Sequence, residues 1–300
     1  MGETLYSRQA TSQRLTKIAH FLTHWQLHKL ARRHYESGFP QMAIFSHDHI
    51  GHVINVDGRY EDDYLKTVFG WLATFTDQLD QKVALDIGAN IGNHAVFFSQ
   101  HFKIVHAFEP NPRTFELLRF NAAPAGNIVA HPQGLSDSDS LGTLHENPTN
   151  MGGTYIELDV ENGRCDQQPV SLGTLDKFVE GRGLSDIALI KIDTEGFEAR
   201  ILRGAQNVLA KHRPIILFEL SPGDFDAQGV SEVVNILKDQ GYRFVTVERN
   251  FQLGPSRIGR YTGFLMRTLF REQYLLREIT RFQPKFYQMI VAVHADIALK

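Results

Sequence analysis

Between residues 82 and 247, short apolar runs rich in β-branched residues alternate with helix-length stretches, which restricts the chain to few folds. Strands separated by helices form βαβ units, whose right-handed crossovers build a mainly parallel sheet. Such sheets bind ligands at the edge where the carboxyl ends of the strands meet. Seven strands are predicted: Val83–Ile87, Ile104–Phe108, Asn127–His131, Ile187–Ile192, Pro214–Leu220, Tyr242–Val247 and Met289–Val293.

Three other segments depart from this alternation. Residues 11–36 are predicted to form a helix, because apolar side chains recur there at spacings of three and four; they are Leu15, Ile18, Leu22 and Trp25. Ser, Asp and Gly residues in 134–172 predict a hairpin or loop excursion. A helical insertion is expected at about 255–285, before the last strand. We therefore expect an N-terminal helical segment over 1–44 and one α/β domain over 45–300.

Charge and cysteine content exclude several classes of protein. With 31 Lys and Arg against 34 Asp and Glu, the net charge of −3 gives no general affinity for nucleic acid. Basic residues nevertheless gather at both ends, with net charges of +4 over 1–38 and +5 over 256–300. The single cysteine, Cys165, excludes an intrachain disulfide and a Cys-rich zinc module. No signal-peptide core is found, nor an apolar run of roughly 20 residues, so we expect a soluble cytoplasmic protein.

The segment Leu85–Gly92 ends an apolar strand and opens a helix, where a glycine-rich turn can hold a ligand at a helix N-terminus. Gly88 allows a sharp turn, and Gly92 allows a helix or ligand to approach closely. About 20 residues further on, Glu109 ends the second strand, where a carboxylate can accept hydrogen bonds from ribose hydroxyls. These residues indicate a nucleoside-containing cofactor, although the carboxylates could instead cap helices.

The glycine spacing distinguishes between two such cofactors. A dinucleotide turn has glycine at its first, third and sixth positions. Here these positions are Gly88, Asn90 and Asn93, so two of the three glycines are missing. Asp86 would also place a carboxylate beside the phosphates of a dinucleotide, whereas it suits the ammonium and sulfonium groups of S-adenosylmethionine. The turn therefore favours S-adenosylmethionine.

Taken together, Leu85–Gly92, Phe108–Pro110 and Leu189–Glu198 resemble an FkbM-type methyltransferase, and the resemblance covers roughly residues 45–220. It implies a class I methyltransferase fold, which is a doubly wound, Rossmann-like sheet. It also implies methylation of a hydroxyl oxygen with S-adenosylmethionine, on sugar or polyketide-like acceptors. The predicted cofactor-binding residues are Asp86, Gly88, Ala89, Asn90, Gly92, Asn93, Glu109, Pro110 and Asp137.

Methyl transfer to an alcohol is an in-line displacement that needs positioning, exclusion of water and a base for the alcohol proton. Asp193 ends the fourth strand at the ligand edge and is the first candidate for this base, with Glu219 as the second. Lys191 lies on the same strand face as Asp193 and can pair with it. The Asn/Asp-Pro-Pro-aromatic run of many amine methylases is absent, which favours oxygen as the acceptor. Asp193 and Glu219 could also bind Mg²⁺, but two carboxylates are too few to favour a metal site.

Contacts with the acceptor are predicted for the segment that precedes the cofactor turn, at His49, Tyr60 and Glu61. Three histidines of the first predicted helix recur every four residues, opposite its apolar face, and are expected to be exposed. They are His20, His24 and His28. In the predicted helix Phe264–Phe282, one face carries arginines. This stripe is expected to bind an anionic acceptor, to contact a second subunit or simply to be exposed to solvent. Its members are Arg267, Arg271, Arg277 and Arg281.

Two other functions remain compatible with these residues. One is a protein that keeps the cofactor pocket but has lost turnover. The other is a nicotinamide-dependent oxidoreductase, which the missing glycines disfavour. The residues distinguish neither the acceptor nor the oligomeric state, and a homo-oligomer is compatible with them.

Overall fold

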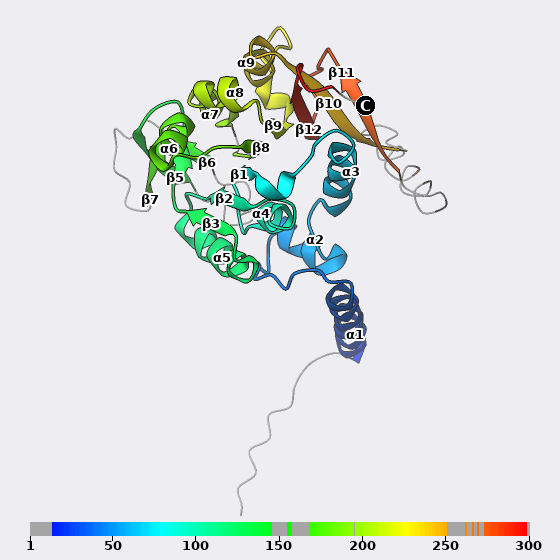
Figure 1. The fold of residues 1–300 in the computed structure, drawn as a ribbon. Coiled ribbons are helices and arrows are strands. Elements are labelled where there is room, and N and C mark those ends of the chain that lie inside the picture. The colour runs from blue at the N-terminus through cyan, green and yellow to red at the C-terminus, as the bar shows by residue number, and fades with distance from the viewer. Residues whose placement is uncertain are drawn as a thin grey trace, which may run out of the picture.

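The alternating strands and helices build a central sheet with helices on both faces (Figure 1). The structure is a computed structural model. It describes residues 14–145, 155–157, 168–194, 196–250, 262, 266, 269 and 273–298.

In the described part of the chain, the central sheet has eight strands in the order β11-β10-β12-β9-β8-β1-β2-β3. The strands from β3 to β9 in this order run parallel, and β12 runs antiparallel between β9 and β10. The doubly wound, mainly parallel architecture of class I methyltransferases is therefore confirmed. The strands are β1 (Val83–Ile87), β2 (Ile104–Phe108), β3 (Ile128–His131), β8 (Ile187–Ile192), β9 (Ile215–Leu220), β10 (Tyr242–Arg249), β11 (Tyr274–Ile279) and β12 (Tyr287–His294).

Two hydrophobic cores cover the two faces of this sheet. One core holds α3 (Asp62–Leu72), α4 (Asn93–Phe98) and α5 (Pro112–Ala122). The other holds α6 (Leu175–Arg182), α7 (Glu198–Arg203), α8 (Gln206–His212) and α9 (Glu232–Asp239). Val83, Leu85 and Ile87 of β1 enter one core and Ala84 enters the other, and all five residues of the strand are buried, as expected for a strand covered on both faces.

The remaining elements lie outside these layers. The helices α1 (Arg14–Glu36) and α2 (His49–Asp57) precede the sheet, and short 3-10 turns are found at Leu79–Gln81, Ala123–Ala125 and Pro222–Asp224. The predicted excursion after β3 carries a second sheet. It has the order β4-β7-β5-β6, formed by β4 (Gly134–Leu135), β7 (Gln168–Gly173), β5 (Ser140–His145) and β6 (Tyr155–Glu157).

Two predictions are wrong at β11. The central sheet has an eighth strand there, and Tyr274–Ile279, predicted as part of a helix over Phe264–Phe282, forms this strand. Tyr274–Ile279 is an antiparallel partner of β10, with Leu276 opposite Val247. Pairing satisfies the backbone donors and acceptors that β10 would otherwise leave open at the sheet edge. Arg277 therefore lies on a strand and not on an arginine-bearing helix face. Arg267 and Arg271 lie outside the described residues.

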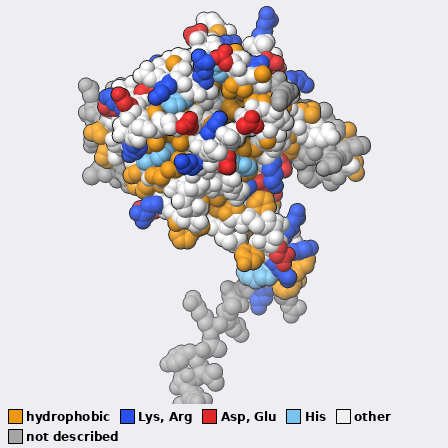
Figure 2. Space-filling view, in the orientation of Figure 1, with side chains coloured by type: hydrophobic (Ala, Val, Ile, Leu, Met, Phe, Trp, Pro, Cys, Tyr) orange, Lys and Arg blue, Asp and Glu red, His pale blue; other side chains and the backbone are white. Residues whose placement is uncertain are grey.

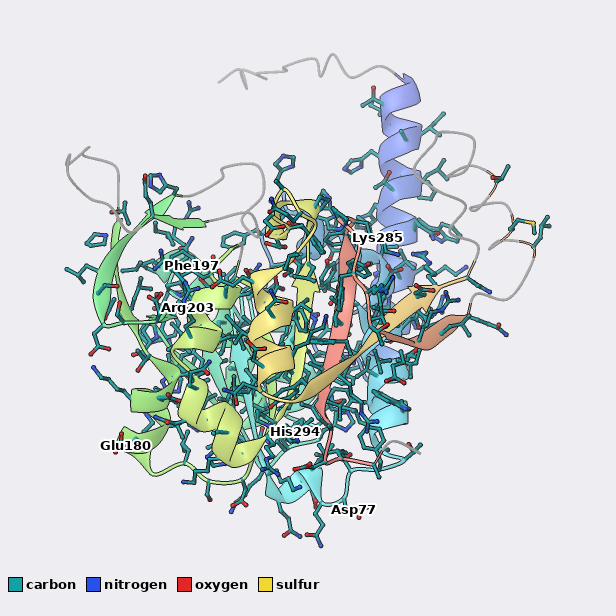
Figure 3. The ribbon with its side chains drawn as sticks, turned by 90° about the horizontal axis from the view of Figure 1, so that it is seen from above. Asp77, Glu180, Phe197, Arg203, Lys285 and His294 are labelled. Carbon is teal, nitrogen blue, oxygen red and sulfur yellow. The ribbon has the colours of Figure 1, made fainter. Side chains whose placement is uncertain are left out.

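The N-terminal helix is found as predicted, but its apolar face is not buried. Ile18, Leu22 and Trp25 are each more than half exposed, and His20, His24 and His28 are exposed as well. The helix projects from the body of the molecule in both ribbon views (Figures 1 and 3). No helix in the described part of the chain is long and apolar enough to cross a bilayer. The domain boundary near residue 44 stays a prediction.

Leu65 tests the packing of α3 on the sheet, because its side chain is fully buried in that core. Leu65→Ala should lower the free energy of unfolding by about 2–5 kcal/mol, through lost burial and the cavity left behind. Leu141→Ala is the matched control, because Leu141 is 68% exposed, and its effect should stay within about 0.5 kcal/mol. Denaturant unfolding measures both, and equal effects would contradict the assigned packing.

Candidate functional site

The glycine turn connects β1 to α4 with an unusual backbone. Gly88 has a φ of +76°, and a Cβ atom there would lie 1.8 Å from the backbone oxygen of Asp193. Only glycine fits this position, so the turn packs directly on the end of β8. Asn90 has a φ of +49°, in the left-handed region that non-glycine residues rarely adopt. This conformation lets the Asn90 N–H donate to Glu109 Oε2 at 3.0 Å.

Glu109 follows β2 and is held by two backbone donors. Its Oε2 accepts from Asn90 and its Oε1 accepts from the N–H of Asn111 at 2.8 Å. Burial of the carboxyl outweighs both hydrogen bonds and raises the pKa of Glu109 to about 7. The group therefore changes protonation near neutral pH.

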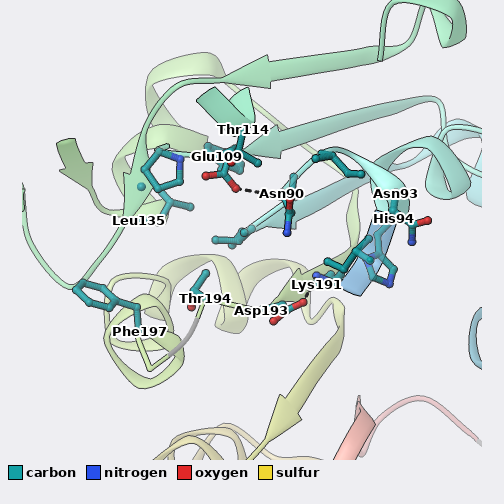
Figure 4. Close-up of a pocket in the computed structure, with 18 of the residues that line it drawn as sticks. Asn90, Asn93, His94, Glu109, Thr114, Leu135, Lys191, Asp193, Thr194 and Phe197 are labelled. Carbon is teal, nitrogen blue, oxygen red and sulfur yellow. Dashed lines mark hydrogen bonds and ion pairs between the residues drawn. The ribbon is translucent and has the colours of Figure 1, made fainter. Parts of the chain in front are cut away.

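A cavity of about 270 Å³ opens at the carboxyl edge of the sheet, where the sequence predicted a ligand site (Figure 4). Its lining includes most of the predicted cofactor residues, and these are Gly88, Ala89, Asn90, Asn93, Glu109 and Pro110. An apolar part of the lining comes from Leu135, Leu144 and Phe197, which the sequence did not single out. Leu144 belongs to β5, so the second sheet contributes to the cavity.

Lys191 lies at the edge of this cavity between two carboxylates. Its Nζ donates to Asp193 Oδ2 at 2.9 Å and lies 3.7 Å from Asp86 Oδ1. Burial alone would lower the pKa of Lys191, but the charges of Asp193 and Asp86 raise it above its ordinary value. Lys191 is therefore a buried cation, and the predicted pairing with Asp193 is confirmed.

Asp193 lines the cavity with a partly exposed side chain. Burial acts to raise its pKa, but the charge and hydrogen bond of Lys191 and the nearby His94 lower the pKa below its ordinary value. The carboxyl is therefore ionised at neutral pH. An ionised carboxylate can accept a hydrogen bond from an acceptor hydroxyl, although a low pKa makes it a weak base.

His94 and Glu61 form a buried pair that sequence reasoning did not identify as a unit. His94 lines the cavity, and its Nε2 lies 3.0 Å from Glu61 Oε2. Because a carboxylate accepts, the ring forms that hydrogen-bond to Glu61 carry the hydrogen on Nε2. Glu61 Oε1 accepts from Gln288 at 3.0 Å, and Glu61 itself has a φ of +58°. His94 comes two residues after Gly92, and this position beside the glycine turn could have identified it as a site residue from the sequence.

The residues predicted to contact the acceptor lie close together. His49 and Tyr60 line the cavity, with ring centroids 6.0 Å apart. Glu61 lines a small adjoining cavity. Glu219, the second candidate base, lines both cavities. Their contact with an acceptor stays a prediction.

Three predicted cofactor residues are not part of the cavity lining. Gly92 packs instead on α5, since a Cβ atom there would lie 2.8 Å from Leu118 Cδ1. Asp86 is fully buried beside Lys191, and neither of its oxygens accepts a hydrogen bond from the described residues. Asp137 is paired with Arg200 and Arg203, each at 3.3 Å, so its carboxylate is engaged elsewhere.

No group of three His, Cys, Asp or Glu side chains is arranged to hold a metal ion among the residues that the structure describes. Asp193, one of the two predicted metal ligands, is already paired with the Lys191 ammonium. The sequence did not favour a magnesium ion at Asp193 and Glu219, and this pairing does not favour one either.

A family model described as the methyltransferase FkbM domain matches residues 86–244, which is more than half of the chain. The chain is 30% identical over 162 residues to the hexuronic acid methyltransferase AglP of Haloferax volcanii, and the match covers 53% of this chain and 64% of AglP. It is 27% identical over 198 residues to the 31-O-demethyl-FK506 methyltransferase FkbM of Streptomyces tacrolimicus, covering 54% of this chain and 73% of that protein. The chain thus matches less than two thirds of the length of AglP.

Solved structures with distant similarity include a methyltransferase FkbM from Methylobacillus flagellatus, with 19% identity and a TM-score of 0.34 over 47% of this chain and 33% of that chain. Another is the magnesium protoporphyrin IX methyltransferase of Synechocystis, with 9% identity and a TM-score of 0.41 over 96% and 100% of the two chains. The family model spans the glycine turn, Glu109 and the Lys191–Asp193 pair, and the chain belongs to the FkbM methyltransferase family.

Proposed function

We propose that this protein is an S-adenosylmethionine-dependent O-methyltransferase that acts on a hydroxyl of a small molecule or glycan. The observation that carries the proposal is that one cavity contains a carboxylate suited to a ribose, Glu109, and an ionised carboxylate suited to an acceptor hydroxyl, Asp193. Membership of the FkbM family supports the same reaction. Both relatives reported above are named as methyltransferases, one for a hexuronic acid and one for 31-O-demethyl-FK506, and the second name supports an oxygen acceptor.

The lining of the cavity fits the parts of S-adenosylmethionine. Glu109 would accept hydrogen bonds from the ribose hydroxyls, and the apolar side chains of Leu135, Leu144 and Phe197 would pack against the adenine. Asp86 provides negative charge beneath the turn; Lys191 lies 3.7 Å from its Oδ1, but neither of its buried oxygens accepts a hydrogen bond from the described residues. When bound, the cofactor supplies an electrophilic methyl group on a sulfonium.

The protein's own residues would then orient the acceptor and take its proton. Lys191 holds Asp193 in place, and Asp193 would accept a hydrogen bond from the acceptor hydroxyl. Two groups are candidates to take the proton, the predicted base Asp193 and the His94 ring that contacts Glu61. The acidic limb of the pH–rate profile separates them. A carboxylate base of lowered pKa places this limb at the acidic end of the profile, and replacement of His94 should then leave the limb unchanged.

Cofactor binding tests the first part of the proposal. Calorimetry should show binding of S-adenosylmethionine or its demethylated product, and no binding of NAD. Glu109→Ala should weaken binding by about 1–3 kcal/mol, because the ribose hydroxyls lose their partner. Leu141→Ala, at an exposed position away from the cavity lining, should bind as the wild type does. Wild-type affinity in Glu109→Ala would remove this residue from the site.

The raised pKa of Glu109 predicts a pH dependence whose sign follows from burial. The carboxyl of Glu109 has a pKa of about 7 in the folded protein, against an ordinary value of 4.5, so it keeps its proton to a higher pH when the protein is folded. Burial of the ionised carboxyl therefore lowers the free energy of unfolding. This penalty is absent below about pH 4.5 and complete above about pH 7. Ribose hydroxyls favour the charged form, so cofactor affinity should rise with pH up to about 7, with proton release at pH 6. Calorimetry in two buffers of different ionisation enthalpy should detect this proton in the wild type and not in Glu109→Gln.

Turnover tests the role of Asp193. Asp193→Asn keeps the shape of the side chain but removes its charge, so turnover should fall on the order of a hundredfold while cofactor affinity holds. Methyl transfer to glucuronic acid, a hexuronic acid, can be followed by mass spectrometry. His94→Gln should shift or remove the acidic limb of the pH–rate profile if the imidazole takes the proton. Cofactor binding without methyl transfer to any alcohol would instead mark a protein that has lost turnover.

A further inference from the structure

The first half of α1 presents an uncovered apolar surface. Ile18, Phe21, Leu22 and Trp25 are 57, 66, 54 and 54% exposed. At about 100° per residue, their spacing of three and four places them on one side of the helix. We call these four residues the apolar row of α1.

The apolar row is not the side by which α1 joins the rest of the protein. The second half of the helix contacts α2, and His34 is buried there with its ring 5.8 Å from that of Phe39. Leu30, four residues before His34, is partly buried on the same side of the helix. This side lies opposite the apolar row, so the row faces away from the body, and the helix projects beyond it (Figure 1).

Positive charge accompanies the apolar row. The helix contains five Lys or Arg residues and a single acidic residue, Glu36, for a net charge of +4. Arg32 already pairs with Glu36 at 2.8 Å, and the Lys29 ammonium lies 5.3 Å from the centre of the Trp25 ring. The space-filling view shows hydrophobic, basic and histidine side chains together on this projecting helix (Figure 2).

We propose that α1 binds the surface of an anionic lipid bilayer, with the apolar row embedded at the level of the headgroups. Helices of this kind lie in the plane of the interface, where aromatic side chains enter the lipid and Lys and Arg contact the phosphates. A second copy of the chain fits less well, because two helices of charge +4 would face each other. Nucleic acid would satisfy the cations but leave the apolar row exposed to water. This inference does not depend on the proposed function.

Trp25 serves as the reporter for the test. The sequence has two tryptophans, so full-length protein carrying Trp71→Phe retains Trp25 alone. The probes are vesicles of phosphatidylcholine with about 30% phosphatidylglycerol, and vesicles of phosphatidylcholine only. Anionic vesicles should shift the Trp25 emission to the blue and sediment the protein. The neutral vesicles should do neither, and about 0.5 M salt should weaken the binding to anionic vesicles.

Two variants separate the apolar and the charged contributions. In the Trp71→Phe background, Ile18→Gln with Leu22→Gln should weaken binding to anionic vesicles at least tenfold. Lys29→Glu with Arg33→Glu should have a similar effect, because each cation near an anionic surface contributes about a fivefold gain in binding. The matched control combines Phe120→Gln with Lys211→Glu. These are an exposed hydrophobic and an exposed cation outside α1, and their replacement should leave binding unchanged.

Several outcomes would overturn the proposal. One is an absence of binding to anionic vesicles, and another is equal binding by the Ile18→Gln, Leu22→Gln variant. A mass by light scattering that doubles with protein concentration, and returns to the monomer in that variant, would assign the apolar row to a second copy. Unchanged thermal unfolding of the variants confirms that the body remains folded.

Discussion

The buried ammonium of Lys191 is the interaction around which the site is arranged. A charge removed from water costs several kcal/mol unless opposite charges and hydrogen bonds compensate it. Asp86, its register partner on β1, and Asp193, two residues further along, provide this compensation. The cation thereby links β1 to β8 and holds Asp193 at the edge of the sheet. The backbone oxygen of Asp193 in turn occupies the space that a side chain at Gly88 would need, so charge pairing and turn geometry depend on each other.

The same cavity contains two carboxyl groups whose environments shift their pKa values in opposite directions. Burial raises the pKa of Glu109 to about 7, although two backbone N–H groups donate to it. Burial acts in the same direction on the partly exposed Asp193, but the adjacent Lys191 lowers its pKa. The difference arises because a full positive charge compensates a buried carboxylate better than peptide dipoles do. One fold can therefore keep one carboxylate ionised and leave the other able to titrate near neutral pH.

Much of the fold was predictable because its signals are local. The predicted strands at β1, β2 and β8 have the observed bounds, since buried parallel strands are continuous apolar runs between turns. The residues after these strands were predictable as site residues for the same reason, and Gly88, Glu109 and Asp193 do line one cavity. The helix predicted over 264–282 is wrong at Tyr274–Ile279, because the apolar spacing there fits two periods and pairing with the distant β10 selects the strand.

The sequence by itself determined the order of strands and helices and the kinds of side chain at the strand ends, because turn formation and apolar periodicity depend on neighbouring residues. Only the tertiary structure decided which charges meet. His94 meets Glu61, 33 residues earlier in the chain, and Asp137 meets two arginines that remove it from the cavity. The tertiary structure also decided which side of α1 is covered. Pairing and burial depend on residues that are distant in sequence, and these neighbours set both the pKa of a group and the exposure of an apolar face.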